Sequence, residues 1–226
     1  MTMDWQAVGV TLRLAACTTL ILCVLGLPLA YWLAVSRWRG KFLLEAVVAL
    51  PLVLPPTVLG FYLLAGLGPR SPAGRLFEAV AGHPFPFSFA GLLTASVLYS
   101  LPFAVQPFAA ALAGVDRRLI EASYTLGVSP LRTFLRVTLP LAWPGVLAGS
   151  VLTFAHTLGE FGVVLMVGGN IPGRTRTLSV AIFDHVEALE YAAAHRTAAL
   201  LLAISFGVLT LVYALQRRPL LRWNDR

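Results

Sequence analysis

The sequence predicts an all-α integral membrane protein with about five transmembrane helices. Of its 226 residues, 58% are hydrophobic and only 12% are charged, and the mean hydropathy is +0.80. Soluble domains carry about 25% charged residues, so this chain has too few polar groups to cover a water-exposed surface. Strand-like alternation is absent, which leaves helices as the membrane spans. Five apolar segments are long enough to cross a hydrocarbon core of roughly 30 Å: 14–35, 42–67, 89–113, 145–168 and 197–216.

Basic residues are distributed unevenly between the segments that join these spans. Eleven of the seventeen Lys and Arg residues fall within 36–41, within 114–140 or after Gln216. Because basic residues accumulate in cytoplasmic loops, the N-terminus is predicted outside and the C-terminus in the cytoplasm. Topology thus accounts for most of the net charge of +7, and no nucleic-acid partner is needed to explain it.

The first two spans differ in their regularity. Span 14–35 runs directly into the basic segment 36–41 and is interpreted as a retained helix rather than a signal peptide. Span 42–67 contains Pro51, Pro55 and Pro56, so several backbone carbonyls lose their amide partners. Such breaks occur where neighbouring helices or a water-filled cavity satisfy the backbone. We predict that Pro55, Pro56 and Thr57 line a pathway through the membrane; a packing kink against another helix is the alternative.

Span 145–168 carries a polar stripe, whereas span 89–113 offers only weaker candidates for a polar pathway. Ser150, Thr153, Thr157 and Glu160 follow a 3-4-3 spacing, which places them on one helical face. Small hydroxyl residues also occur at ordinary helix–helix contacts, so the stripe faces either the pathway or another helix.

Glu160 is the most informative residue within the membrane. A carboxylate in hydrocarbon costs at least a few kcal/mol and is a functional candidate by default. Three interpretations are open: it is protonated, it is hydrogen-bonded to His156 one turn earlier, or it braces a gate at the outer constriction. We predict a structural or gating role for Glu160, with His156 as its candidate partner.

The predicted cytoplasmic loop 114–140 has the form of a helical hairpin. Asp116 can cap a first short helix, and Gly127 can adopt a left-handed turn without steric cost. Ser129 is expected to cap a second helix that starts at Pro130 and ends at Pro140. The apolar side chains of this hairpin suit a groove on another protein better than the polar edges of DNA bases.

The spacing within this loop resembles that of the permeases of bacterial ABC importers. Their loop reads E-A-A, three residues, G, nine residues, I-x-L-P, and this chain has Ser in place of the second Ala and Val in place of Ile. The resemblance implies a type I ABC importer permease fold, with the loop seated in a cleft of a separate ATPase subunit. It assigns ATPase coupling to Glu121, Ala122, Ser123, Leu126, Gly127, Leu131, Phe134, Leu139 and Pro140.

Two further stretches are similar to the molybdate-type permeases. They are LPLVLPPTVLGFYLL (50–64) and HTLGEFGVVLMVGGNIPGRTRTLSVAIFDHVEA (156–188), and sulfate and thiosulfate permeases have similar segments. The resemblance implies a single-domain, multi-pass subunit (1–226) of the bacterial cytoplasmic membrane that imports molybdate or tungstate, with sulfate or thiosulfate as the alternative. It also implies a second copy of the chain, two ATPase subunits that carry ATP and Mg, and a periplasmic or extracellular oxyanion-binding protein. No cofactor is expected in this chain.

The predicted outer loop 169–196 contains further candidates. Asn170, Arg174 and Arg176 lie in or beside a glycine-rich segment, where they would draw an oxyanion inward or dock the binding protein. A simple positively charged loop is the alternative. Segment 178–195 is amphipathic and is expected to form an outer helix.

The sequence shows no catalytic nucleophile–base arrangement, no metal-ligand cluster and no G-x-x-x-x-G-K-[ST] motif for ATP. The chain is therefore predicted to be a transport subunit without an ATP site of its own. Two more distant alternatives are an ion-coupled secondary transporter and a membrane-tethered helix-turn-helix DNA-binding protein.

Overall fold

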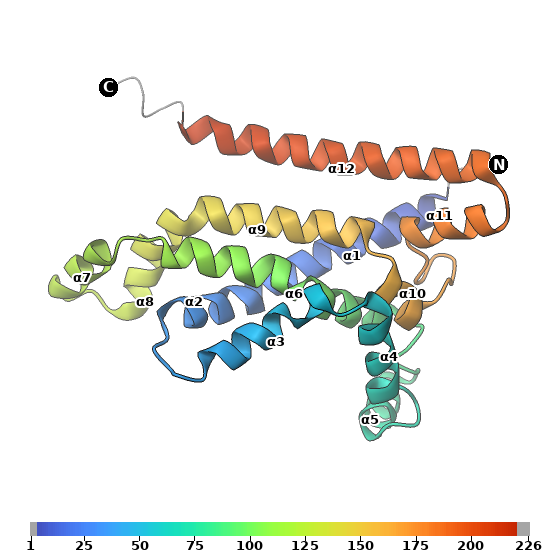
Figure 1. Cartoon of the computed structure of the whole chain (residues 1–226), viewed down its shortest axis with the longest axis horizontal. Helices are drawn as coiled ribbons and strands as arrows, with labels where there is room; N and C mark the ends of the chain where they lie inside the picture. Colours follow the sequence, from blue (N-terminus) through green and yellow to red (C-terminus); the bar gives the residue numbers. More distant parts are fainter. Residues whose placement is uncertain (1–3, 221–226) are drawn as a thin grey trace.

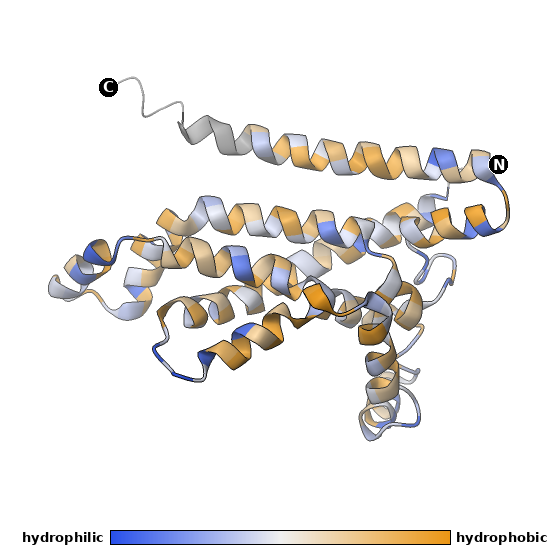
Figure 2. Cartoon of the chain, in the orientation of Figure 1, coloured by the Kyte–Doolittle hydropathy of each residue, from blue (hydrophilic) through white to orange (hydrophobic). Residues whose placement is uncertain are grey.

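The computed structural model describes residues 4–220, and every regular element within that range is a helix. Four helical runs are long and apolar enough to cross a membrane, and a bent helix pair makes a fifth. Many large apolar side chains are exposed, and hydrophobic residues run along most of the long helices (Figure 2). Extensive apolar patches are rare on soluble monomers but normal on lipid-facing surfaces. The prediction of an all-α membrane protein with about five spans is confirmed.

The first span starts earlier than expected and contains a local widening. Helix α1 (Trp5–Ile21) continues through the π-helical turn η1 (Leu22–Gly26) into α2 (Leu27–Val35). Asp4 caps its start, because the Asp4 carboxylate accepts a 2.9 Å bond from the backbone N–H of Ala7. The wider turn ends two residues before Pro28, whose missing N–H would otherwise interrupt a regular helix.

The second span is broken at its prolines. Helix α3 (Lys41–Val53) and helix α4 (Pro56–Leu67) meet at 112°. Leu54 and Pro55 both have extended backbone, with ψ of 136° at each. A proline disfavours the helical conformation in the residue before it, so two successive prolines force two non-helical residues. Helix α4 then leads into the short α5 (Pro72–Ala81), and both project away from the bundle (Figure 1).

The third span is the centre of the bundle. Helix α6 (Phe89–Ala113) begins where Ser88 accepts a 3.1 Å bond from the backbone N–H of Gly91. It packs against α1, α2, α3, α9 and α10, and its Leu92, Val105 and Phe108 are almost fully buried. Its bounds agree with the predicted span 89–113.

The cytoplasmic hairpin and the fourth span form one continuous unit. Helices α7 (Arg117–Thr125) and α8 (Pro130–Thr133) are followed without interruption by η2 (Phe134–Thr138) and α9 (Leu139–Gly159). The expectation that a helix ends at Pro140 is therefore wrong. In the π-helical turn the N–H of Leu139 bonds to the carbonyl of Phe134, and this wider turn accommodates a proline at the next position.

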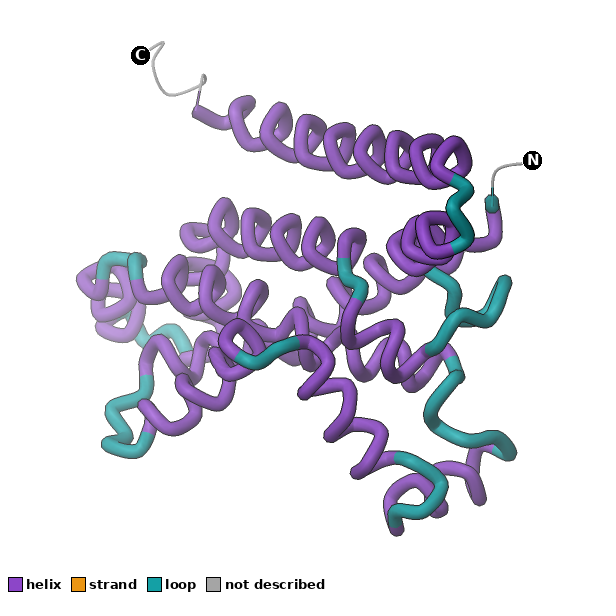
Figure 3. The backbone as a smooth tube through the Cα atoms, turned by 45° about the vertical axis from the view of Figure 1, so that its right-hand side comes forward, coloured by secondary structure: helices purple, strands orange, loops and turns teal. Residues whose placement is uncertain are grey.

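The chain leaves regular helix again at Glu160 and Phe161, inside the predicted span 145–168. Helix α10 (Gly162–Gly168) follows, then the outer loop and α11 (Leu178–Glu187). Leu189 has a positive φ of 59° in the tight turn to α12 (Tyr191–Leu220), which is the outermost helix of the bundle (Figure 3).

The two ends of the bundle differ in their charge. The loop between α2 and α3, the α7–α8 hairpin and the C-terminal end of α12 lie at one end, as the positive-inside pattern predicts (Figure 1). The N-terminus, α10 and α11 lie at the opposite end. Of the basic residues used in that prediction, Arg222 and Arg226 lie outside the described residues.

Candidate functional site

The two broken spans touch each other at their breaks. A Cβ added to Gly162, at the start of α10, would lie 2.7 Å from the Cβ of Pro56, at the start of α4. One turn further along α4, a Cβ on Gly60 would lie 2.7 Å from the Cβ of Met166. Both distances are far below an ordinary contact, so only glycine permits this close crossing of α4 and α10. The structure thereby brings two regions of non-helical backbone together near the outer end.

Glu160 lies at the second break and is 5% exposed. Its carboxylate accepts a 2.5 Å bond from the hydroxyl of Ser96 on α6. Its backbone carbonyl accepts a 2.5 Å bond from the hydroxyl of Ser179 on α11. The other carboxylate oxygen, Oε1, has no hydrogen-bond partner in the described part of the chain. Glu160 therefore connects the break to two other helices.

The interpretation in which Glu160 bonds to His156 is wrong. His156 Nδ1 lies 3.0 Å from the hydroxyl of Ser100, and its ring stacks on Phe103 with 3.8 Å between the ring centroids. Helix α9 ends at Gly159, and Glu160 has extended backbone with ψ of 132°. A side chain beyond the helix end no longer shares a face with the residue one turn earlier, so Glu160 turns to α6 instead.

The hydroxyl stripe on α9 lies at a contact between helices of this chain. Thr153 and Thr157 are buried, and their hydroxyls donate to the carbonyls of Gly149 and Thr153. Thr157 also lies 3.1 Å from the hydroxyl of Ser100 on α6. By contrast, Pro55 and Thr57 are exposed at the α3–α4 break. Of the predicted pathway residues, the structure places Pro55, Pro56, Thr57 and Glu160 at the two breaks. It packs Thr157 and His156 against α6 and buries Thr153.

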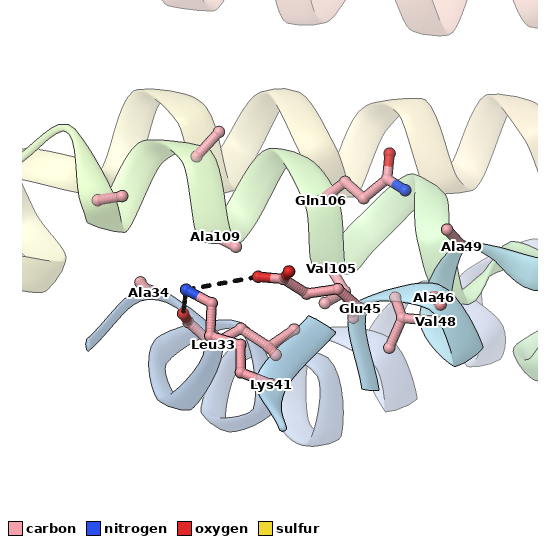
Figure 4. A pocket seen from close by; sticks show the side chains of 12 residues that line it. Leu33, Ala34, Lys41, Glu45, Ala46, Val48, Ala49, Val105, Gln106 and Ala109 are labelled. Carbon is pink, nitrogen blue, oxygen red and sulfur yellow. Dashed lines mark hydrogen bonds and ion pairs between the residues drawn. The ribbon is translucent and has the colours of Figure 1, made fainter. Parts of the chain in front are cut away.

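A groove of about 570 Å³ lies between α2, α3 and α6, toward the cytoplasmic end. Half of its twelve lining residues are alanines, and Figure 4 shows Lys41 and Glu45 directed toward each other there. Lys41 Nζ donates a 2.9 Å bond to the carbonyl of Leu33 and lies 3.4 Å from the Glu45 carboxylate. Helix α3 therefore lines this groove over its first half and carries the proline break at its far end.

The cytoplasmic hairpin is held together from inside and exposes apolar side chains outside. Gly127 adopts a φ of 74°, as its predicted turn requires. The hydroxyls of Ser123 and Thr133 lie 2.9 Å apart and join the two helices. Leu126 is 82% exposed and Leu131 is 68% exposed.

Not all predicted coupling residues lie on the outer surface of the hairpin. Glu121, Ala122 and Pro140 are exposed, like Leu126, Gly127 and Leu131. Ser123 is buried, and the ring of Phe134 packs edge-on against Tyr31 of α2 at 4.7 Å. Leu139 packs against the core. The expected cap by Ser129 is wrong, because its side chain makes no capping bond; Ser129 instead accepts a 2.9 Å bond through its carbonyl from Thr133.

At the outer end, the structure separates the roles of the two predicted arginines. Arg176 pairs with Asp184 of α11 at 2.6 Å and lies 3.6 Å from the carboxylate of Asp4. It is therefore engaged within the chain as a brace between the N-terminus and α11. Arg174 and Asn170 are exposed.

Two residues at the outer break, Gly162 and Ser179, were not predicted from the sequence. The G-E-F-G run at 159–162 contained a signal for Gly162, because a second glycine just after a buried carboxylate indicates close packing. No pattern indicated Ser179, since its partner lies on a different helix. Within the described residues, no three His, Cys, Asp or Glu side chains form a group that could hold a metal ion.

Comparison with known proteins agrees with this architecture. Residues 26–221 match the family described as binding-protein-dependent transport system inner membrane component. The molybdenum transport system permease protein ModB of Azotobacter vinelandii is 54% identical over 214 residues, covering 95% of each chain. ModB of Escherichia coli K12 is 40% identical over 184 residues, covering 81% of this chain and 80% of that protein.

Solved structures of two transporters share the fold. An inward-facing form of the MetNI methionine ABC transporter aligns with a TM-score of 0.76 and 19% identity, covering 96% of this chain and 95% of that one. A bacterial ABC transporter for the import of alginate aligns with a TM-score of 0.79 and 15% identity, covering 94% and 78%. At these identities the likeness establishes the fold alone.

Proposed function

Because the chain belongs to the family of binding-protein-dependent transport system inner membrane components, we propose that it is the membrane-spanning subunit of an ATP-driven importer of molybdate. The substrate rests on the ModB relative that is 54% identical over 95% of both chains. Tungstate has the same tetrahedral dianionic chemistry and is a second substrate. Sulfate and thiosulfate are the alternative substrates, since their permeases contain similar segments.

The proposed mechanism rests on one uninterrupted helical run that joins the cytoplasmic hairpin to the outer break. Residues Pro130–Gly159 form one helical run of 30 residues, which starts in the hairpin and ends next to Glu160. At ~1.5 Å per residue this run is about 45 Å long, so it reaches across the hydrocarbon core. A displacement of the hairpin is transmitted along this run to the place where α9, α10 and α4 meet.

The exposed hairpin is the surface that receives the force. The sequence contains no P-loop motif, so a separate ATPase supplies the energy and holds ATP and Mg. Leu126 and Leu131 would insert into a cleft of that ATPase, where burial of their apolar surface stabilises the contact. Two ATPase subunits and two copies of this chain form the transporter, with the pathway at their two-fold axis.

The breaks form the gate in this proposal. Backbone that is not helical is tolerated in a membrane where it lines a cavity or is buried in protein. Pro55 and Thr57 are exposed at the first break, where a second copy would cover them, and Glu160 anchors the second break to α6 and α11. An extracellular binding protein delivers the oxyanion to this end of the molecule.

The test is reconstitution of the permease with its ATPase and binding protein in proteoliposomes. We expect molybdate-loaded and tungstate-loaded binding protein to stimulate ATP hydrolysis and to drive uptake of labelled anion. Stimulation by sulfate but not by molybdate would contradict the substrate assignment. Uptake that needs no ATP and collapses with an ionophore would replace the proposal by an ion-coupled transporter.

A further inference from the structure

A small cleft lies at the outer end, between α1, the start of α6 and the outer loop. It has a volume of about 280 Å³ and is lined by Gln6 and Arg13 of α1, Phe89 at the start of α6, and Gly173 and Arg174 of the outer loop. Gly173 has a φ of 71°, and a Cβ there would lie 3.0 Å from Gln6 Oε1. The loop therefore approaches α1 closely and closes one side of the cleft.

The cleft carries two positive charges and no negative one. No carboxylate lies within ion-pair distance of Arg13 or Arg174 in the part of the chain that the structure describes. Two acidic groups of this end are engaged elsewhere: Asp4 caps α1 and faces Arg176, and Asp184 pairs with Arg176. Both arginines are exposed, so the cleft presents positive charge at the surface and favours an anion.

Arg13 is also held in a defined position. Its Cζ lies 4.3 Å from the centroid of the Phe89 ring, which is a cation–π contact. This contact holds the guanidinium group beside the ring, and its N–H groups remain available to another partner. Phe89 is the first residue of the 25-residue helix α6, so the positive end of that helix dipole adds to the field in the cleft.

We propose that this cleft binds a tetrahedral oxyanion, with Arg13 and Arg174 as its charged ligands and Gln6 as an additional amide donor. Guanidinium groups match the geometry of oxyanions because they donate two parallel hydrogen bonds. The loop that carries Arg174 directly follows α10, so the cleft lies on a segment connected to the second break. This inference rests on the proposed function, and it gives the permease an oxyanion site of its own outside the gate. A lipid phosphate has the same chemistry and is the other source of such a ligand.

The experiment measures equilibrium binding of labelled molybdate to the permease–ATPase complex in lipid nanodiscs, without binding protein and with empty discs as background. We expect saturable binding to the wild-type complex. Arg13→Gln and Arg174→Gln should each weaken it by about tenfold, the effect of losing one hydrogen-bonded charge. Arg13→Lys should restore part of the affinity. Arg70→Gln is the matched control, because it removes an exposed arginine of the outer α4–α5 connection and should leave binding unchanged.

Two results would overturn the proposal. The first is absence of saturable binding, or equal binding by Arg13→Gln, Arg174→Gln and Arg70→Gln. The second is loss of molybdate binding when phosphatidylglycerol is added to phosphatidylcholine discs, with the lipid effect absent from Arg13→Gln. A lipid headgroup would then be the ligand of the cleft. Stimulation of ATP hydrolysis by loaded binding protein is measured in the same preparation. If stimulation persists while direct binding is absent, the cleft assignment alone fails; if binding persists without stimulation, the proposed function alone fails.

Discussion

The two ends of the helical run Pro130–Gly159 are built in opposite ways. At the cytoplasmic end, the hairpin exposes apolar side chains such as Leu126, and its buried hydroxyls of Ser123 and Thr133 bond to each other. At the outer end, the break buries the carboxylate of Glu160, which bonds to Ser96 of a neighbouring helix. The hairpin is thus a surface that needs another protein to cover it, whereas the break is closed by contacts within the chain. Changes at the hairpin should affect coupling alone, and changes at the break should affect both stability and transport.

The largest expected effect is that of Gly127→Pro. Its φ of 74° is incompatible with the proline ring, which fixes φ near −65°, and the change also removes the N–H that bonds to the Tyr124 carbonyl at 2.9 Å. We expect loss of binding-protein-stimulated ATP hydrolysis in proteoliposomes, with the thermal midpoint of the permease nearly unchanged. Gly127→Asn is the control, because asparagine tolerates the left-handed region and should retain activity. Wild-type stimulation by Gly127→Pro would show that the hairpin does not couple the subunits.

A smaller effect is expected from Gly162→Ala, which tests the crossing of the two breaks. The added methyl group would overlap Pro56, and such overpacking costs about 1–3 kcal/mol. Gly159→Ala is the matched control, because a Cβ at Gly159 meets no atom within 4 Å. The midpoint temperature of unfolding in detergent and the uptake rate should both fall for Gly162→Ala. Both should be unchanged for Gly159→Ala. Equal behaviour of the two variants would mean that the close contact of α4 and α10 is not needed.

The smallest effect is expected from Glu160→Gln, which retains the shape and the acceptor for Ser96 but removes any charge. A single hydrogen bond contributes about 1 kcal/mol, so weakening the bond from Ser96 should lower transport about fivefold. Ser96→Ala should act on the same contact, and the double variant should be no worse than the more impaired single variant. If Glu160→Gln left uptake and coupled ATP hydrolysis unchanged, the gating role would be refuted.

Much of the fold could be predicted from the sequence, because membrane spans and turns depend on residues that are close together in the chain. The bounds of α6 agree with the predicted span, and Gly127 adopts the left-handed turn that its position indicated. The predicted helix end was wrong where a π-helical turn lies, as at Pro140, because a wider turn removes the clash that makes proline end a helix. The break at Glu160 was also not predicted, because no proline marks it in the sequence.

The class of molecule, its orientation in the membrane and the hairpin could be read from the chain alone, because apolar length, basic loops and a glycine turn act locally. Which polar groups are paired depends on how the helices pack together. Glu160 bonds to Ser96, 64 residues earlier, and Arg176 bonds to Asp184 and faces Asp4, while Arg174 and Arg13 are left facing one cleft. Hydrogen bonds and ion pairs act over a few ångströms, so partners that are distant in the chain become known only when the helices are placed together.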